Sequence, residues 1–133
     1  TAANLRRAFD AADVLVSFNG KRFDVPFLER EFGLDVTTPH LDLLYPARRV
    51  GLTGGLKTIE RAVGIDRDSD VDGREAVALW HRYEAGDEAA LDRLVRYNRL
   101  DAENLLALLD AVTDRLDREV FEPHLPEDAS AIR

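Results

Sequence analysis

The pattern of apolar and polar positions predicts a buried strand near the N-terminus, with a helix before it. Residues 13–18 are mostly apolar and rich in strand-forming residues, and a run without alternation is typical of a strand buried on both faces. The turn residues Asn19 and Gly20 end this strand. In the preceding segment, 3–12, helical spacing brings four apolar residues to one side: Leu5, Ala8, Phe9 and Ala12.

A second helix and a second strand are expected after this turn. Asp24 is a suitable N-cap, Pro26 fits the first helical turn, and Gly33 can end the helix. A short strand is then predicted from His40 to Leu44, ending before Pro46. This strand is the weaker of the two predictions because its apolar run is short.

The C-terminal half is predicted to be helical. Its expected elements are a flexible loop at 51–55, a helix at 56–63, a polar turn at 65–73, a helix at 74–85, a long helix at 87–121 that could bend near residue 97, and a loose tail at 122–133. The sequence contains no internal repeat and no low-complexity segment.

These elements form an unusual set for a complete α/β domain. A strand that is apolar on both faces needs neighbours to pair with. Two interpretations stay open: a helical protein with a two-stranded patch, or a domain whose further strands lie upstream of Thr1. Because the chain starts with Thr1 and contains no methionine, we expect it to be an excerpt or a processed product.

Composition restricts the possible functions. The chain has 26 acidic and 18 basic residues, a net charge of −8, which repels nucleic acid at long range unless the positive charges cluster. With 16 arginines, two lysines and 16 aspartates, it fits a protein from a high-salt cytosol, where salt screens the repulsion. An ordinary acidic cytosolic protein is the alternative. The absence of cysteine excludes disulfides, a thiolate nucleophile and Cys-ligated zinc. No stretch approaches the ~18 apolar residues of a membrane span, so we expect a cytoplasmic protein without a membrane partner.

Asp24 is the first candidate for chemistry. A carboxylate just past the carboxyl end of a strand lies where α/β sheets place their ligands. The same residue could instead only cap the next helix, with Asn19 and Gly20 forming a simple turn. The local pattern leaves both readings open.

Tyr97 and Asp101 are the second candidates, because residues four apart share one helix face. On a helical projection, Asp101 falls inside the edge of an apolar arc, Asn98 near its middle and Tyr97 on its flank. The arc is defined by Leu94, Leu105, Leu109, Val112 and Leu116. A carboxylate there is costly unless something positive meets it, which leaves an arginine or a metal ion as its partner.

Other polar residues carry weaker signals. The histidines His40, His81 and His124 are scattered and are expected to be structural. The loop 51–55 lacks the ending of a phosphate-binding loop. Trp80 and Tyr83 are expected in the core. Three basic residues could touch phosphate: Arg48, Arg49 and Lys57.

Taken together, the two motifs resemble the DEDD (DnaQ-like) superfamily of 3′–5′ exonucleases. A strand followed by Asn-Gly-x-x-Phe-Asp precedes, at a distance, a helix with Tyr-x-x-x-Asp, and the connecting stretches are similar to the predicted YprB-like branch. The resemblance spans about residues 5–112. Its matching stretches are 16–20, 23–28, 40–44, 55–60 and 97–101.

The resemblance implies a ribonuclease H-like α/β fold over 1–121, followed by the tail 122–133. In the family, four carboxylates hold two divalent cations, Mg²⁺ or Mn²⁺, which cleave the phosphodiester bond. By resemblance, Asp24 and Asp101 are two of these ligands, and Tyr97 orients or deprotonates the water, which favours alkaline pH because a free phenol has a pKa of about 10. The expected contacts to single-stranded nucleic acid come from Asn19, Phe23, Asn98 and Lys57.

The family's first motif, an Asp-x-Glu on an earlier strand, is absent from these residues. We therefore expect the domain to be truncated at its N-terminus, and the chain to hydrolyse little by itself. Two alternatives remain: an inactive nucleic-acid-binding module, and an acidic interaction protein without a nucleic-acid role. An exposed strand edge would also favour a homodimer.

Overall fold

The computed structural model describes residues 1–66 and 73–121, so the predicted tail and most of the predicted polar turn lie outside the described residues. Within these ranges the chain forms two strands and six helices, which confirms the predicted α/β class. The elements are α1 (Ala2–Asp10), β1 (Leu15–Ser17), α2 (Asp24–Phe32), β2 (His40–Asp42), α3 (Leu44–Arg49), α4 (Leu56–Ala62), α5 (Gly73–Glu84) and α6 (Glu88–Phe121).

The two strands form a parallel pair connected through α2. Their register places Leu15 opposite His40 and Ser17 opposite Asp42. The backbone N–H of Leu43 donates to the carbonyl of Ser17 at 2.8 Å, which extends the pairing by one hydrogen bond. Because the strands are parallel, both carboxyl ends meet at one edge. The residues that follow β1 and β2 are therefore neighbours.

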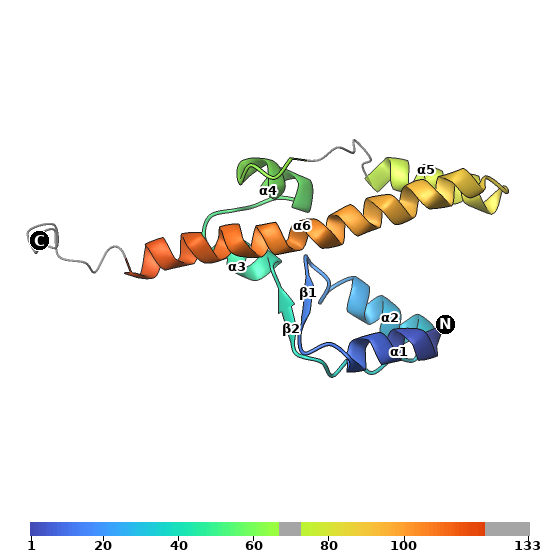
Figure 1. Cartoon of the computed structure of the whole chain (residues 1–133), viewed down its shortest axis with the longest axis horizontal. Coiled ribbons are helices and arrows are strands. Elements are labelled where there is room, and N and C mark those ends of the chain that lie inside the picture. Colours follow the sequence, from blue (N-terminus) through green and yellow to red (C-terminus); the bar gives the residue numbers. More distant parts are fainter. Residues whose placement is uncertain (67–72, 122–133) are drawn as a thin grey trace, which may run out of the picture.

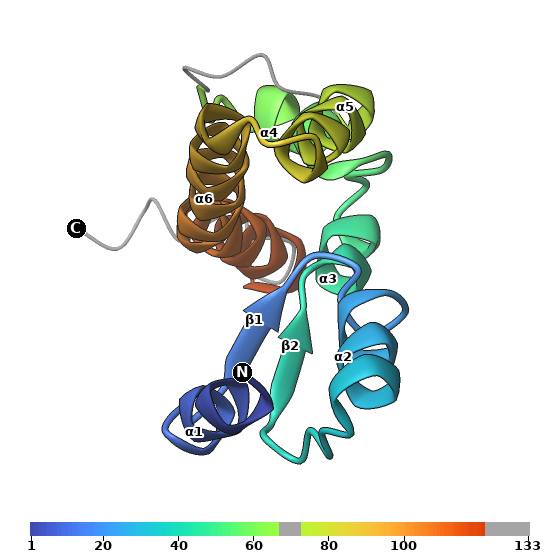
Figure 2. The same cartoon turned by 90° about the vertical axis from the view of Figure 1, so that its right-hand side faces the viewer.

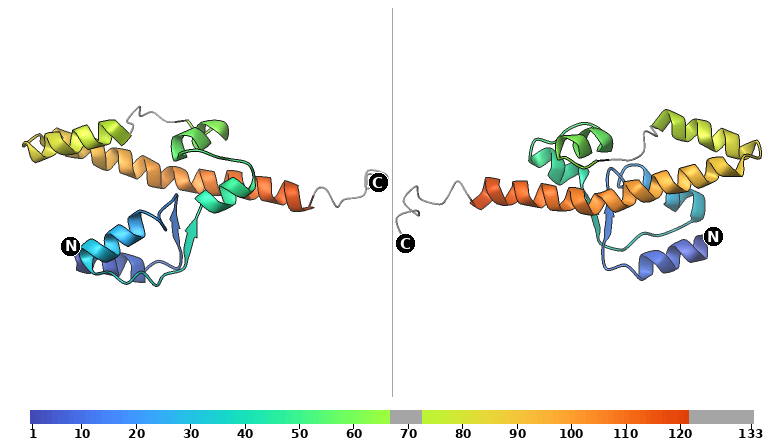
Figure 3. Two further views of the ribbon diagram at one scale, coloured as in Figure 1. Left: turned by 180° about the vertical axis from the view of Figure 1, so that it is seen from behind. Right: turned by 45° about the horizontal axis from the view of Figure 1, so that its top comes forward.

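The long helix α6 separates the other elements into two groups. The strand pair with α1 and α2 lies on one side of α6, and α4 and α5 lie on the other (Figures 1 and 3). The carboxyl ends of the strands point toward α6 (Figure 2). This arrangement brings the loop after β1 close to the middle of α6.

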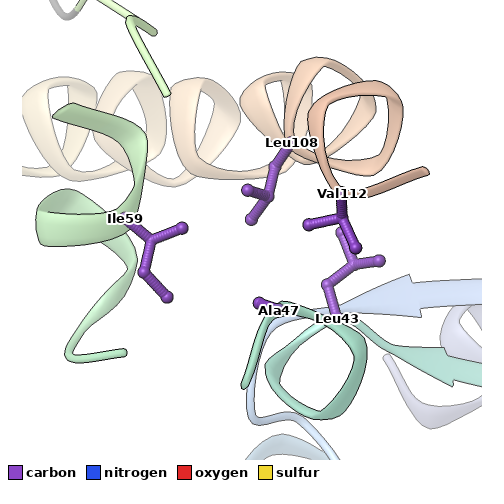
Figure 4. Packing of buried hydrophobic residues seen from close by; sticks show 5 residues of the cluster. All are labelled: Leu43, Ala47, Ile59, Leu108 and Val112. Carbon is purple, nitrogen blue, oxygen red and sulfur yellow. The ribbon is translucent and has the colours of Figure 1, made fainter. Parts of the chain in front are cut away.

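Two apolar clusters hold α6 in place. The larger one joins the α3 region, α4 and the C-terminal part of α6, and its side chains point toward one another in Figure 4: Leu43, Ala47, Ile59, Leu108 and Val112. The smaller one joins α5 to the N-terminal part of α6 through Leu79, Ala90 and Leu94. By contrast, α1 and α2 contain no buried residue.

Several predicted boundaries were wrong. The first strand covers only Leu15–Ser17 rather than 13–18, because β2 offers partners to only these three residues. The predicted strand 40–44 ends at Asp42, and α3 follows it at once. Pro46 was expected to stop an element, but it lies in the first turn of α3, where its missing N–H has no helical partner to lose. Helix α6 is unbroken at residue 97.

The expectation that Trp80 belongs to the core was also wrong. Its side chain is 48% exposed, although its ring lies 5.5 Å from that of Tyr83. Tyr83 is half-buried and packs against the smaller cluster. Helix α5 therefore contacts α6 through the face that carries Leu79 and Tyr83, and Trp80 lies outside this contact.

Candidate functional site

The loop after β1 is a tight turn that ends at Asp24, the first residue of α2. Asn19 has a positive φ of 64°, a conformation that asparagine tolerates better than most residues. The N–H of Arg22 donates to the carbonyl of Asn19 at 3.3 Å, and the N–H of Val25 donates to that of Gly20 at 2.9 Å. These bonds close the turn within a few residues.

Asp24 is not the N-cap of α2, so that reading of the sequence was wrong. Phe23 occupies the cap position, no side chain caps the helix, and Asp24 is its first residue. Backbone carbonyls of the turn accept the N–H groups of Val25 and Phe27, so the carboxylate of Asp24 is not needed as a cap.

Gly20 is required by a close approach between this turn and β1. A Cβ at this position would lie 2.5 Å from Ser17 Oγ, 2.7 Å from Ser17 Cβ and 3.3 Å from Asp24 Oδ2. The N–H of Gly20 donates to Ser17 Oγ at 3.2 Å. The absence of a side chain at Gly20 therefore lets the turn fold back onto the end of β1, beside Asp24.

A pocket of about 270 Å³ is lined by residues from the end of β1, the start of α2, α4 and the middle of α6. Its polar lining comes from Ser17, Asp24, Asn98 and Asp101. The apolar lining is completed by Val16, Phe18, Leu56, Ala102 and Leu105. The pocket thus brings together two acidic residues that are far apart in the sequence, Asp24 on α2 and Asp101 on α6.

Four of the predicted site residues do not line this pocket. The ring of Tyr97 packs against the smaller apolar cluster, and Lys57 Nζ lies 5.1 Å from the centroid of that ring. Phe23 is 65% exposed. Asn19 lies in the turn, and its buried Oδ1 accepts no hydrogen bond from the described residues.

Asp42 is the residue that the sequence did not single out. It is 2% exposed, and its carboxylate accepts backbone N–H bonds from Asn19 at 2.6 Å, Lys21 at 3.0 Å and Leu44 at 3.2 Å. The sequence placed it in the middle of the predicted strand 40–44, whereas the structure ends this strand at Asp42, beside the turn that follows β1.

The remaining candidates lie elsewhere. His40 Nε2 is 2.7 Å from Ser17 Oγ, His81 Nδ1 is 3.2 Å from Glu84 Oε2, and His124 lies outside the described residues. Arg48 and Arg49 are exposed. A second buried acid, Glu60, accepts a hydrogen bond from Asn104 Nδ2 at 3.2 Å, away from the pocket lining.

The donor chemistry of the pocket fits one divalent cation. Two carboxylates and the side-chain oxygens of Asn98 and Ser17 are hard ligands, and Mg²⁺ is usually held by one or two carboxylates together with water. Within residues 1–66 and 73–121, however, no three His, Asp or Glu side chains gather closely enough to hold a metal ion.

Comparison with known proteins identifies the class. A family model of the RNase_H superfamily matches residues 1–113, and the chain belongs to this family. Membership indicates a nuclease-like function and nucleic-acid binding, and members of this superfamily commonly use divalent metal ions. No curated protein and no solved structure matches the chain. In the part that the structure describes, no helix has the length and apolar character needed to cross a membrane.

Proposed function

We propose that this domain belongs to a metal-dependent 3′–5′ exonuclease that acts on single-stranded nucleic acid. The observation that carries the proposal is the pocket that both Asp24 and Asp101 line. Family membership supports the nuclease character. The exonuclease type rests on the resemblance of the Phe-Asp and Tyr-x-x-x-Asp motifs to the DEDD superfamily, whose members act on nucleic-acid ends.

The proposed roles of Asp24, Asp101 and Asn98 follow from their place in the pocket lining, and the role of Tyr97, which lies outside the lining, follows from the resemblance alone. Asp24 and Asp101 would hold a divalent cation, which when bound supplies a more acidic water and positive charge beside the scissile phosphate. Tyr97, one helical turn before Asp101, would orient the water or accept its proton. Asn98 would donate hydrogen bonds from its amide to the substrate.

Three further residues would hold the substrate strand. Lys57 places an ammonium group beside Tyr97, where it would attract a backbone phosphate. Phe23 is exposed next to Asp24, and its ring is accessible for stacking with a base. Asn19, in the turn that precedes Phe23, would contact the strand through its side-chain amide.

The two carboxylates offset only part of the +4 charge of a metal pair. We therefore propose that the 133-residue chain binds one cation weakly and hydrolyses little, and that a form with an Asp-x-Glu strand ahead of residue 1 is active. Loss of a single pre-positioned electrostatic group typically lowers a rate by ~10²–10³, and here more than one ligand has to be added.

Mn²⁺ binding to the 133-residue chain tests the site. In ¹H–¹⁵N spectra, paramagnetic broadening is expected first at the amides of Ser17, Asp24, Asn98 and Asp101. Asp24→Asn and Asp101→Asn should each remove the selective broadening. The matched controls are Asp35→Asn and Asp110→Asn, which change exposed aspartates elsewhere and should leave it intact. Equal broadening in all four variants would refute the site.

Release of mononucleotides from a 3′-labelled single strand tests the reaction in the longer form. Asp24→Ala and Asp101→Ala should abolish Mn²⁺-dependent release, and Tyr97→Phe should lower it while Mn²⁺ binding persists. If the folded, metal-loaded protein binds the strand without degrading it, the domain is an inactive binding module instead.

A further inference from the structure

We propose that Asp42 is a positioning residue that holds the turn 19–23 in place and thereby sets the position of the Asp24 carboxylate. This inference rests on the proposed function, because Asp24 acts there as a metal ligand. Asp42 does not line the pocket itself. Its influence would pass through the backbone of the turn.

The contacts of Asp42 connect the ends of both strands. Oδ1 accepts the N–H of Asn19 at 2.6 Å and that of Leu44 at 3.2 Å, and Oδ2 accepts the N–H of Lys21 at 3.0 Å. Two of the three donors therefore belong to the turn that leads into Asp24. The third belongs to the start of α3, which is packed into the larger apolar cluster through Leu43 and Ala47. The Asp42 carboxylate thus links this turn to the start of α3 and, through it, to the larger apolar cluster.

The charge of Asp42 is compensated by these backbone groups. A carboxylate that is 2% exposed pays a large desolvation penalty unless donors meet it. Among residues 1–66 and 73–121, no arginine, lysine or histidine forms an ion pair with it, so the three N–H dipoles provide the compensation. An asparagine would keep the shape but present an NH₂ group to an N–H donor.

The turn is held from two directions. Asp42 binds Asn19 and Lys21 from the side of β2, and Ser17 accepts the N–H of Gly20 from the side of β1. Between them, a Cβ at Gly20 would lie only 3.3 Å from Asp24 Oδ2, so the turn passes close to this carboxylate. In contrast, α2 buries no residue of its own. The position of Asp24 therefore depends more on the turn than on packing of its helix.

Asp42→Asn in the 133-residue chain tests this inference, with Mn²⁺ as the probe. The dissociation constant, measured from the broadening at Ser17 and Asp101, should rise about tenfold or more, because loss of a group that orients a ligand typically costs 10–100-fold in metal affinity. The amide signals of Lys21 and Asp24 should shift in the metal-free protein. The control is Ile59→Val, a core change remote from the turn, which should lower the melting temperature without changing Mn²⁺ affinity.

The outcomes separate the two ideas. No selective broadening in the wild type overturns the proposed function. Broadening in the wild type with equal affinity in Asp42→Asn overturns the role of Asp42 alone. If Asp42→Asn does not fold, Gly20→Ala is measured instead, because it displaces the same turn and leaves Asp42 intact. An unchanged Mn²⁺ affinity in Gly20→Ala would also overturn the inference.

Discussion

Gly20→Ala offers the sharpest test of how the turn is packed. The added methyl group would lie 2.5 Å from Ser17 Oγ and 2.7 Å from Ser17 Cβ, both inside contact distance. Ser17 Cβ is fixed to the backbone of β1, which is paired with β2, so it cannot move aside without breaking that pairing. Gly20 does not have a positive φ, so steric overlap rather than backbone strain sets the cost. Overpacking of this kind costs about 1–3 kcal/mol of unfolding free energy.

Substitutions at Ser17 separate the two overlaps. Ser17→Ala removes Oγ but keeps Cβ, so most of the cost of Gly20→Ala should persist in that background. Ser17→Gly removes both atoms and should reduce the cost by about 1 kcal/mol or more, after its own strand penalty of about 0.5–1 kcal/mol is subtracted. Urea unfolding followed by circular dichroism gives each free energy.

Gly73→Ala is the matched control for this series. A Cβ at Gly73 meets nothing within 4 Å, and Gly73 begins α5, where alanine favours the helix. This variant should be neutral or slightly more stable than the wild type. A Gly20→Ala variant as stable as the wild type, or one that Ser17→Gly does not rescue, would refute the packing argument.

Four further predictions concern stability and assembly. Leu108→Ala empties a fully buried position in the larger cluster and should cost about 2–5 kcal/mol in urea unfolding, whereas a loss below about 1 kcal/mol would contradict its place in the core. Side-chain hydrogen bonds from Arg82 hold the pKa of Asp87 below its ordinary value. The pair therefore stabilises the fold at pH values above the ordinary pKa, and this contribution is lost as the pH falls through the lowered pKa. The stability advantage of the wild type over Asp87→Asn should therefore shrink as the pH falls to and below the ordinary pKa of aspartate, and an advantage independent of pH would contradict this prediction. The sheet shows only two paired strands within the described residues, so we expect a homodimer that pairs through a strand edge. A monomer mass by light scattering in both low and high salt would exclude this dimer. The net charge of −8 and the arginine-rich, lysine-poor composition predict a melting temperature that rises with KCl, and a flat response would contradict the high-salt interpretation.

Local patterns in the sequence were enough to predict most of the elements. The N-terminal strand was predicted from an apolar run, the helix after Asp24 from its end residues and the long C-terminal helix from its apolar arc, and each signal belongs to one segment alone. The predicted burial of the strand on both faces was wrong, because Leu15, Val16 and Ser17 are each only partly buried. Helix α3 escaped prediction because Pro46 looks like a stop signal, and only the position of the proline within the helix decides between a stop and a first turn. The exposure of Trp80 could not be predicted, because a residue at the edge of an amphipathic face is buried or exposed according to its neighbour helix.

The placement of Asp24 and Asp101 around one pocket could not be predicted from local patterns. No local periodicity relates α2 to α6, and the expectation that these two acids belong together came from the resemblance of their motifs alone. The role of Asp42 lay out of reach for another reason. Its partners are backbone N–H groups, which every residue except proline carries, so no residue type in the turn points to it.

The two sides of the pocket are supported by different forces. Asp101 lies on α6, which is fixed on both sides of this position by apolar clusters that contain Leu94 and Leu108. Asp24 lies on α2, which buries no residue and depends on Gly20, Ser17 and Asp42 for its position. Hydrogen bonds in a surface turn open at lower free energy than a packed core. Changes in the turn should therefore separate the two acids while α6 stays folded, so that metal affinity and global stability can be varied independently in this domain.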